Sequence, residues 1–324
     1  MDKLLSNKVL AFLKLVRLEN LIMIALTQIL LRTFVIQKIM SETGAASELN
    51  NSLFYLVVLS TVLIAAAGYI INDYFDVKTD LINHPDTVVV DRIIKRRWAI
   101  MLHISFTFAG VVLGMYAALK IGYLRLAIFH FSAAFLLWIY STHLKKQLLI
   151  GNVVVSLLTA SVAFMPVVYE MGIMQKVHPD FISTHRLTIL YSLKITLLFS
   201  LFAFITSMAR EIIKDIEDYK GDKATGGLTM PIVWGIRASQ LNAFFLLSIT
   251  SLLLLFVVYN TIKAQHIFLS INNIYILVGL ITPLISIALF VLKASHSKQF
   301  KRASILLKFV MFLGLCYSFI FYYC

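Results

Sequence analysis

Long apolar runs recur along the chain, and short polar stretches separate them. Nine runs have the length of about twenty residues that an α-helix needs to cross a ~30 Å hydrocarbon core. The runs lie at about 16–36, 53–71, 98–118, 121–141, 148–169, 188–209, 239–259, 272–292 and 303–322. The pattern therefore predicts an all-α, polytopic membrane protein in which residues 1–324 form one transmembrane domain with nine helices.

The composition also favours a protein of the membrane. Hydrophobic residues make up 60% of the chain and charged residues 14%, and the mean hydropathy is +0.87. A soluble domain needs more polar surface than this composition provides. We therefore expect no soluble domain beside the membrane bundle.

The net charge of +13 is concentrated on one side of the predicted bundle. Twenty of the 29 Lys and Arg residues lie at the N-terminus or in every second loop. Because basic loops stay on the cytoplasmic side, they predict a cytoplasmic N-terminus and an outside C-terminus, in a bacterial or archaeal cell membrane. Such loops are typical of contact with anionic membrane lipids, and their placement argues against a nucleic-acid partner.

Half of the acidic residues lie in two short stretches on this same predicted face. Residues 72–80 and 211–222 carry 8 of the 16 Asp and Glu residues, and each stretch follows a predicted span. Gly221 is expected to end the helix of the second stretch. Helical spacing aligns Asn72, Asp76 and Asp80, with Asp73 one position away, and it aligns Glu211, Asp215, Asp218 and Asp222. Each stretch therefore presents one acidic stripe.

Two facing carboxylate stripes at a membrane boundary need cations, because like charges repel and lose hydration there. All-oxygen ligands favour hard ions, and Mg²⁺ is typically held by one or two carboxylates together with substrate phosphates. The alternative is a solvated helix face whose acids pair with nearby lysines. Lys214, Lys220 and Lys223 make this plausible for the second stretch. It explains the first stretch poorly, because only Lys78 lies close by in sequence.

Basic and aromatic residues on the same face are candidates for binding a phosphate-bearing ligand. Lys and Arg side chains commonly stabilise a departing phosphate. Each of them can equally be an ordinary basic residue of a cytoplasmic loop. Tyr140, near the motif ends, can offer its π face to a carbocation, although any single aromatic is more often a packing residue. The basic candidates are Lys95, Arg96, Arg97, Lys145, Lys146 and Arg210.

The acidic stretches resemble the two signatures of the UbiA superfamily of intramembrane prenyltransferases. The first resembles Asn72-Asp73-x-x-Asp76-x-x-x-Asp80 followed by Asn83-x-Pro85. The second resembles Lys214-Asp215-Ile216-Glu217-Asp218-x-x-Gly221-Asp222. The resemblance covers the whole chain, through Arg17-x-x-Asn20, the nine spans, Tyr140-Ser141-x-x-Leu144-Lys145 and Gly151-Asn152.

This resemblance implies nine helices around a central cavity that is open sideways to lipid and capped by cytoplasmic loops 72–97 and 210–237. The tail of a prenyl diphosphate would lie in the bilayer, and Mg²⁺ would draw the diphosphate away so that an acceptor captures the allylic cation. The implied metal ligands are Asn72, Asp73, Asp76, Asp80, Asp215, Asp218 and Asp222. The implied catalytic residues are Asp76, Asp80, Asp215, Asp218 and Lys145. The implied substrate-binding residues are Asn20, Asn72, Arg96, Arg97, Tyr140, Lys145, Lys146 and Arg210.

The acceptor is the least determined part of this hypothesis. Residues 87–92 depart from the Arg-Pro-Ile-Pro-Ser-Gly-like run of many aromatic-acceptor members. The second motif looks closest to the branch that prenylates geranylgeranylglyceryl phosphate, whose phosphate Lys145 and Lys146 would bind. An aromatic quinone precursor is the alternative acceptor. From another class, an ion-coupled transporter also uses intramembrane acids, but these usually lie at the bilayer midplane on broken helices.

Overall fold

The computed structural model describes residues 2–42, 44 and 46–323, which form helices joined by short loops. In this part of the chain nine helices are long and apolar enough to cross a membrane. They are Leu18–Glu42, Asn51–Asn83, Arg96–Ile121, Leu124–Thr142, Ile150–Val177, Arg186–Glu217, Ile236–Ala264, Ile271–Lys293 and Ser297–Tyr323. The prediction of an all-α membrane protein with nine spans is confirmed.

The first half of the chain contains five spans and their flanking helices. Their elements are α1 (Asp2–Leu15), α2 (Leu18–Leu30), the π-helical η1 (Leu31–Ile36), α3 (Gln37–Glu42), α4 (Asn51–Asn83), η2 (Pro85–Thr87), α5 (Arg96–Ile121), η3 (Leu124–Leu126), α6 (Ala127–Thr142), η4 (Leu144–Lys146) and α7 (Ile150–Val177). The second half contains the other four spans. Their elements are α8 (Phe181–Thr184), α9 (Arg186–Glu217), α10 (Tyr219–Ala224), α11 (Met230–Val233), α12 (Ile236–Gln265), α13 (Ile271–Ile274), the π-helical η5 (Tyr275–Ile281), α14 (Thr282–Lys293) and α15 (Ser297–Tyr323).

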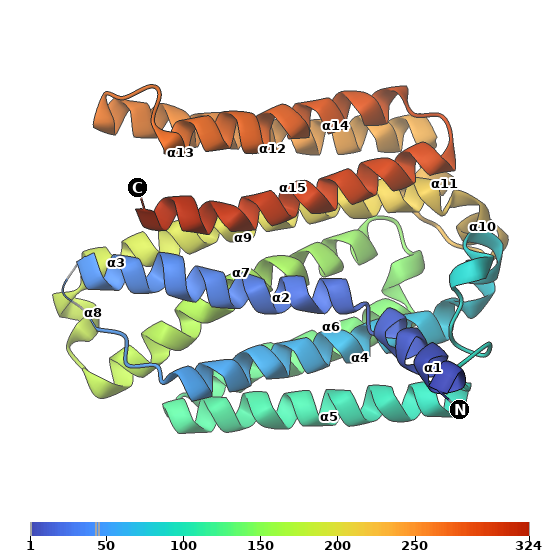
Figure 1. Ribbon diagram of the computed structural model, residues 1–324, viewed down its shortest axis with the longest axis horizontal. Coiled ribbons are helices and arrows are strands. Elements are labelled where there is room, and N and C mark those ends of the chain that lie inside the picture. Colours follow the sequence, from blue (N-terminus) through green and yellow to red (C-terminus); the bar gives the residue numbers. More distant parts are fainter. Residues whose placement is uncertain (1, 43, 45, 324) are drawn as a thin grey trace.

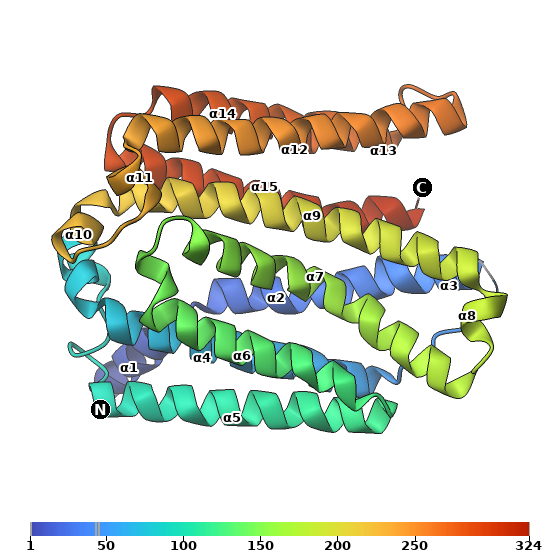
Figure 2. The ribbon, with the colours of Figure 1, turned by 180° about the vertical axis from the view of Figure 1, so that it is seen from behind.

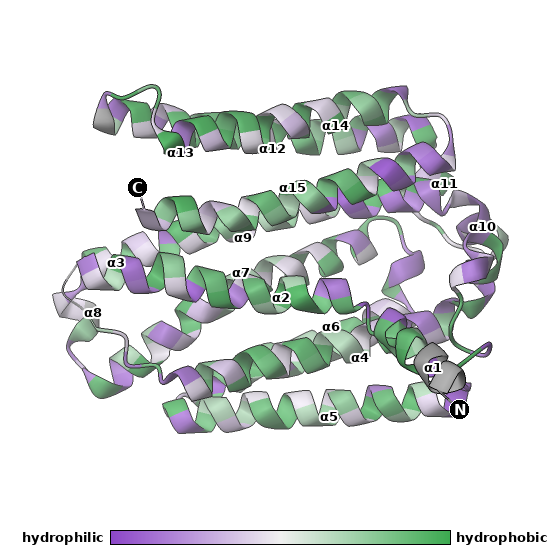
Figure 3. Ribbon diagram, in the orientation of Figure 1, coloured by the Kyte–Doolittle hydropathy of each residue, from purple (hydrophilic) through white to green (hydrophobic). Residues whose placement is uncertain are grey.

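The long helices run side by side, so their connections gather at two ends of the bundle (Figures 1 and 2). One end carries α1, α10 and the last turns of α4 and α9, and we call it the acidic end because both acidic stretches lie there. The opposite end carries α3, α8 and α13, and the C-terminus lies toward it. The middle parts of the helices are mostly hydrophobic, and hydrophilic residues gather toward the two ends (Figure 3). This distribution suits a bilayer.

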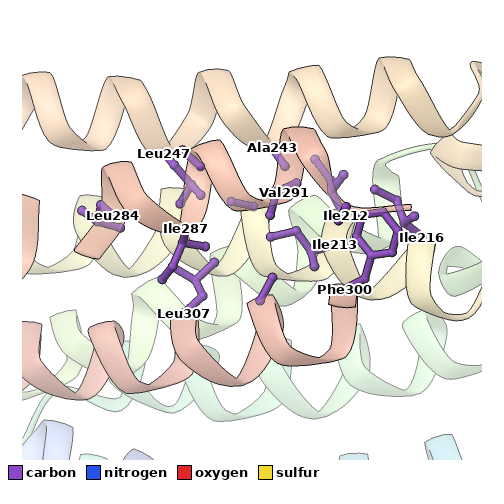
Figure 4. Close-up of a cluster of buried hydrophobic side chains, with 14 of the residues drawn as sticks. Ile212, Ile213, Ile216, Ala243, Leu247, Leu284, Ile287, Val291, Phe300 and Leu307 are labelled. Carbon is purple, nitrogen blue, oxygen red and sulfur yellow. The ribbon is translucent and has the colours of Figure 1, made fainter. Parts of the chain in front are cut away.

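A large apolar cluster holds the C-terminal spans together. α9, α12, α14 and α15 contribute interdigitating side chains to it (Figure 4). Ile212, Leu247 and Leu284 in this cluster are fully buried. Because lipid removes most of the hydrophobic driving force between spans, close van der Waals packing has to supply the attraction. The cluster fixes α9, and with it the helix that carries the second acidic stretch.

Both acidic stretches lie on helices, which corrects the expected ends of two spans. α4 continues to Asn83 and α9 continues to Glu217, so each helix extends well past its apolar run. Gly221 does not end the second helix, because α9 already ends at Glu217 and Gly221 lies within α10. The helices continue because their polar side chains find hydrogen-bonding partners on neighbouring elements.

A buried ion pair joins the first span to the fifth near the opposite end. The Nε of Arg32 donates to Glu170 Oε2 at 3.2 Å, and its Nη1 donates to Asn51 Oδ1 at 2.8 Å. Ser47 Oγ donates to the other Glu170 oxygen at 2.6 Å. Arg32 is 3% exposed and Glu170 is 0% exposed. Each of these charges depends on the other for its stabilisation.

Glu170→Ala is expected to destabilise the protein by about 3–5 kcal/mol, because it leaves the Arg32 charge buried and unpaired. Thermal unfolding in detergent measures this loss. Glu48→Ala is the matched control, since it removes only an exposed contact to His178 Nε2 at 3.2 Å and should change little. Equal melting temperatures for the two variants would contradict the prediction.

Candidate active site

The first acidic stretch forms a hydrogen-bonded stripe on the last turns of α4. Asn72 Nδ2 donates to Asp76 Oδ2 at 2.7 Å, and both side chains are buried. Asn72 Oδ1 is also buried, and no atom of the described residues donates a hydrogen bond to it. Asp80 continues the stripe one turn further along α4. A buried amide oxygen without a donor, next to carboxylates, is suited to bind a hard cation.

Lys145 reaches this stripe from η4, between α6 and α7. Its ammonium contacts Asp76 Oδ2. Burial favours the neutral amine, but the charges of Asp76 and Asp80 outweigh it, so the pKa of Lys145 is raised and the side chain stays cationic. Gly151 permits this approach of the loop, because a Cβ at that position would lie 2.8 Å from the Leu144 carbonyl oxygen.

The second acidic stretch is divided between α9 and α10. Asp215, near the end of α9, accepts a hydrogen bond from Asn152 Nδ2 of α7 at 2.8 Å. Asp218 follows α9 directly, and its Oδ1 lies 2.8 Å from His84 Nε2. Burial would raise the pKa of Asp218, but the His84 contact and the charge of Lys214 outweigh it, so the pKa is lowered. The same contact raises the pKa of His84.

Direct contacts join the two stretches to each other. Asn83, at the end of α4, donates from Nδ2 to the Asp218 carbonyl oxygen at 2.9 Å and accepts at Oδ1 from the Gly221 amide at 2.8 Å. Thr79 Oγ1 and Thr225 Oγ1 lie 3.0 Å apart. A Cβ on Gly221 would collide with the Asn83 amide, so only glycine allows α10 to approach this closely.

The carboxylates of the two stretches lie close enough to influence each other's ionisation. Burial and the charges of Asp218 and Asp76 raise the pKa of Asp222 to about 6, although Lys145 and Lys214 oppose this rise. Asp76 belongs to the first stretch and Asp222 to the second. The structure therefore brings the two stripes together in one acidic site.

A cavity of about 620 Å³ extends from this site into the bundle, as the predicted architecture requires. Residues of α2, α4, α6, α7, α9 and α15 line it. Its polar lining near the acidic end includes Asn20, Asn72, Tyr140, Lys145 and Arg210. Mostly apolar side chains line the remainder. An anionic head and an apolar tail of one ligand would each meet a matching environment here.

Three predicted substrate-binding residues are directed elsewhere. Arg96 Nε pairs with Asp91 Oδ2 at 2.7 Å, within the loop after α4. Arg97 is exposed. Lys146 is exposed, and its Nζ donates to the Thr225 carbonyl oxygen at 3.2 Å. None of these three residues lines the cavity.

Asp73 has a partner different from those of the stripe. Its Oδ1 accepts from Arg17 Nη2 at 2.9 Å, and the Arg17 guanidinium lies over the Tyr69 ring at 5.0 Å. Asp73 is one position away from Asn72, which turns it about 100° around the helix. Arg210, also a predicted binding residue, lines the cavity while its Nη1 pairs with Glu211 Oε1 at 2.9 Å.

Sequence reasoning missed two residues that the fold brings to this region. His84 contacts Asp218, and together with Glu217 these residues offer three ligand atoms within 4.8 Å of one another. Lys308 lines the cavity from α15, although it lies far from both motifs in sequence. Adjacency to Asn83 was the only available signal for His84. No pattern in the sequence indicates that Lys308 reaches this region.

A mostly apolar cavity inside a membrane bundle, whose polar end at Asn72 and Lys145 adjoins the acidic stripes, is the architecture of an integral-membrane enzyme for amphiphilic substrates. The model of the UbiA prenyltransferase family matches residues 39–316. The chain belongs to this family.

Relatives of known name point to one branch of the family. The chain is 33% identical to the digeranylgeranylglyceryl phosphate synthase of Methanothermobacter thermautotrophicus over 61% of its own length and 63% of that protein. It is 32% identical to the Pyrococcus horikoshii protein of the same name over 72% of each chain. The first of these matches thus spans less than two thirds of the relative's length.

Solved structures show the same fold. A structure of digeranylgeranylglyceryl phosphate synthase aligns with a TM-score of 0.64 and 23% identity, over 98% of this chain and 100% of the other. A UbiA homologue from Archaeoglobus fulgidus bound to DMAPP and Mg²⁺ aligns with a TM-score of 0.50 and 17% identity, over 95% of this chain and 98% of the other.

Asn83→Ala should lower turnover about tenfold or more, because the Asp218 carbonyl and the Gly221 amide lose their partner and α10 is no longer held against α4. Steady-state kinetics measures the effect. Asn260→Ala is the matched control, since Asn260 is exposed and bonds only within α12, to the Phe256 carbonyl oxygen at 2.8 Å. Unchanged turnover in Asn83→Ala would show that this contact does not position the site.

Proposed function

We propose that the protein is a Mg²⁺-dependent prenyltransferase that transfers a geranylgeranyl group from its diphosphate to the hydroxyl of geranylgeranylglyceryl phosphate. One observation carries the proposal: Asp76 of the first acidic stripe contacts the Lys145 ammonium, and Lys145 and Asn72 line the polar end of a lipid-sized cavity. Family membership and the names of the relatives support it. The basic loops of the acidic end favour a cytoplasmic site, with the C-terminus outside.

The residues present fit a magnesium site. The donor set consists of carboxylates and the buried Asn72 Oδ1, which has no hydrogen-bond donor among the described residues. Oxygen ligands of this kind match a hard cation that keeps waters and shares substrate phosphates. The DMAPP and Mg²⁺ bound by the Archaeoglobus fulgidus homologue support the same combination here. The proposed ligands are Asn72, Asp76, Asp80, Asp215, Asp218 and Asp222, while Arg17 neutralises Asp73.

The reaction breaks the bond between C1 of the donor and its diphosphate oxygen and forms an ether bond to the acceptor hydroxyl, with release of diphosphate and a proton. Bound Mg²⁺ would neutralise the leaving diphosphate. The Lys145 ammonium is positioned to donate to the departing oxygens, and Tyr140 to face the allylic cation with its ring. The apolar lining excludes water, which protects that cation until the hydroxyl attacks.

The dimensions of the cavity support a C20 donor. Its lining runs along α6 from Tyr140 to Ile128 and along α9 from Lys214 to Phe199. These intervals of twelve and fifteen residues correspond to about 18–23 Å along the helix axes. An extended chain advances about 1.1–1.2 Å per bond, and an isoprene unit adds about four main-chain bonds, so roughly four to five units fit.

The phosphate of the acceptor needs cations other than Lys145, which faces the diphosphate, and Lys146, which is outside the cavity. Arg17, Arg210, Lys214 and Lys308 line the cavity near its polar end. Lys308 is the most available of these, because its 2.8 Å partner Glu19 is 87% exposed and such pairs are weak.

Asp76→Asn and Asp215→Asn should each lower turnover at least about 100-fold while the protein stays folded, because a neutral amide stabilises the departing charge less. EDTA should abolish wild-type activity, and added Mg²⁺ should restore it. Product formation from geranylgeranyl diphosphate is the measurement. Full activity in both variants, or turnover in EDTA, would rule out this mechanism.

Lys308→Ala should raise KM for geranylgeranylglyceryl phosphate about tenfold, with little change for the prenyl donor, if Lys308 contacts the acceptor phosphate. Lys298→Ala, an exposed lysine earlier on α15, is the control. Wild-type enzyme that prenylates 4-hydroxybenzoate and not the glyceryl phosphate would refute the acceptor assignment and leave the prenyltransferase assignment intact.

A further inference from the structure

Formation of the ether bond releases the proton of the acceptor hydroxyl, so the site needs a group that accepts this proton. A general base lies within about 2.6–3.2 Å of the hydroxyl oxygen, or acts through one water. The Lys145 ammonium has no free lone pair, and the carboxylates proposed as Mg²⁺ ligands would direct theirs to the metal. The base is therefore expected on the cavity wall, outside the proposed metal ligands.

Glu211 of α9 occupies such a position. Among the described residues, it contributes the one carboxylate that lines the cavity. It lies about one helical turn before Asp215, so it adjoins the proposed metal ligands without being one of them. His130 also lines the cavity and could accept a proton, but it lies ten residues from Tyr140 along α6, about 15 Å from the polar end.

Two cations keep Glu211 ionised and leave one of its oxygens available. Its Oε1 accepts from Arg210 Nη1 at 2.9 Å. Its Oε2 lies 3.9 Å from Lys214 Nζ, which is beyond hydrogen-bonding distance. Neighbouring positive charge favours the carboxylate over the carboxylic acid. In the described part of the chain no hydrogen bond reaches Oε2, so this oxygen can accept a proton from a bound ligand.

The same two cations are suited to hold the acceptor beside Glu211. Arg210 Nε is buried, and no hydrogen-bond acceptor of the described residues reaches it. A buried donor without a partner indicates that a ligand completes its hydrogen bonds. Arg210 and Lys214 both line the cavity, and guanidinium and ammonium groups bind phosphate well. The free hydroxyl and the phosphate of the acceptor belong to the same glycerol unit, so a phosphate at these cations brings the hydroxyl close to Glu211.

We infer that Glu211 is the general base that takes the proton of the acceptor hydroxyl, through its Oε2. This inference rests on the proposed prenyltransferase function. The hydroxyl oxygen forms its bond to C1 of the donor while its proton passes to Glu211, and the electron pair of the broken C1–O bond leaves with the diphosphate. Glu211 is then neutral, and it returns its proton to solvent after the product has left.

The test compares two acceptors, geranylgeranylglyceryl phosphate and its analogue with a thiol in place of the free hydroxyl. A thiol ionises with a pKa of about 8.5 and needs no base at a pH of about 9, whereas an alcohol stays protonated there. Glu211→Gln should therefore lower kcat with the alcohol at least about 100-fold, and should lower transfer to the thiol at that pH by less than about threefold.

Two further variants separate the loss of the base from other effects. Glu211→Gln keeps an oxygen in the place of Oε1 for Arg210, so KM for the acceptor should change little. Glu211→Asp keeps a carboxylate and should be at least about tenfold more active with the alcohol than Glu211→Gln. Asp86→Asn is the matched control, since Asp86 is an exposed carboxylate of η2 that does not line the cavity, and its loss should affect neither acceptor.

The outcomes separate the two levels of the hypothesis, with melting temperatures in detergent to verify that each variant is folded. Wild-type turnover of the alcohol by Glu211→Gln, or an equal loss with the alcohol and the thiol, overturns the assignment of Glu211. For an enzyme that does not accept the thiol, equal activities of the Gln and Asp variants overturn it as well. A wild-type enzyme that transfers no prenyl group from geranylgeranyl diphosphate to geranylgeranylglyceryl phosphate instead overturns the proposed function.

Discussion

The structure depends on keeping many carboxylates together at one end of a membrane bundle. Two features make this possible. Carboxylates that are drawn away from water have a cation or an amide close by at two central positions, since Asp76 has Lys145 and Asn72, and Asp215 has Asn152. The helices that carry them are tied to each other by Asn83, so mutual repulsion does not separate the two stretches. Without these partners the acids would have to be protonated or exposed.

At the opposite end of the bundle, buried charges are paired in a different way. There the charges of Arg32 and Glu170 are buried and matched, and their hydrogen bonds involve residues of the loop before α4. Such a pair fixes geometry and leaves no free ligand atoms for a substrate. The acidic end has an unused buried oxygen at Asn72, and the cavity opens toward it. This asymmetry distinguishes a reactive site from a structural ion pair within one protein.

The fold was largely predictable because span length and hydropathy depend only on local sequence. Most of the acidic stripe was predictable for a similar reason, since spacing along a helix decides which of Asn72, Asp73 and Asp76 share a face. The arrangement of Asp218 after the end of α9 was not predictable, because it depends on contacts with Asn83 of α4 and with His84, which follows α4. The sequence could not show that Arg96 and Lys146 lie outside the cavity lining, because charge places a residue on a membrane face but does not direct its side chain. Lys308 depends on the packing of the first and last spans, which no local pattern reports.

The pairing of cations with acids in the free protein also links the binding of metal and substrate. Lys145 is held by Asp76, and Arg210 by Glu211. Under the proposed function, Asp76 would help to hold a metal ion in place of Lys145, and the Lys145 ammonium would then be free to bind the diphosphate. Metal binding would free Lys145 from Asp76, and diphosphate binding would give Lys145 a new anionic partner. Metal and diphosphate should therefore bind with positive coupling.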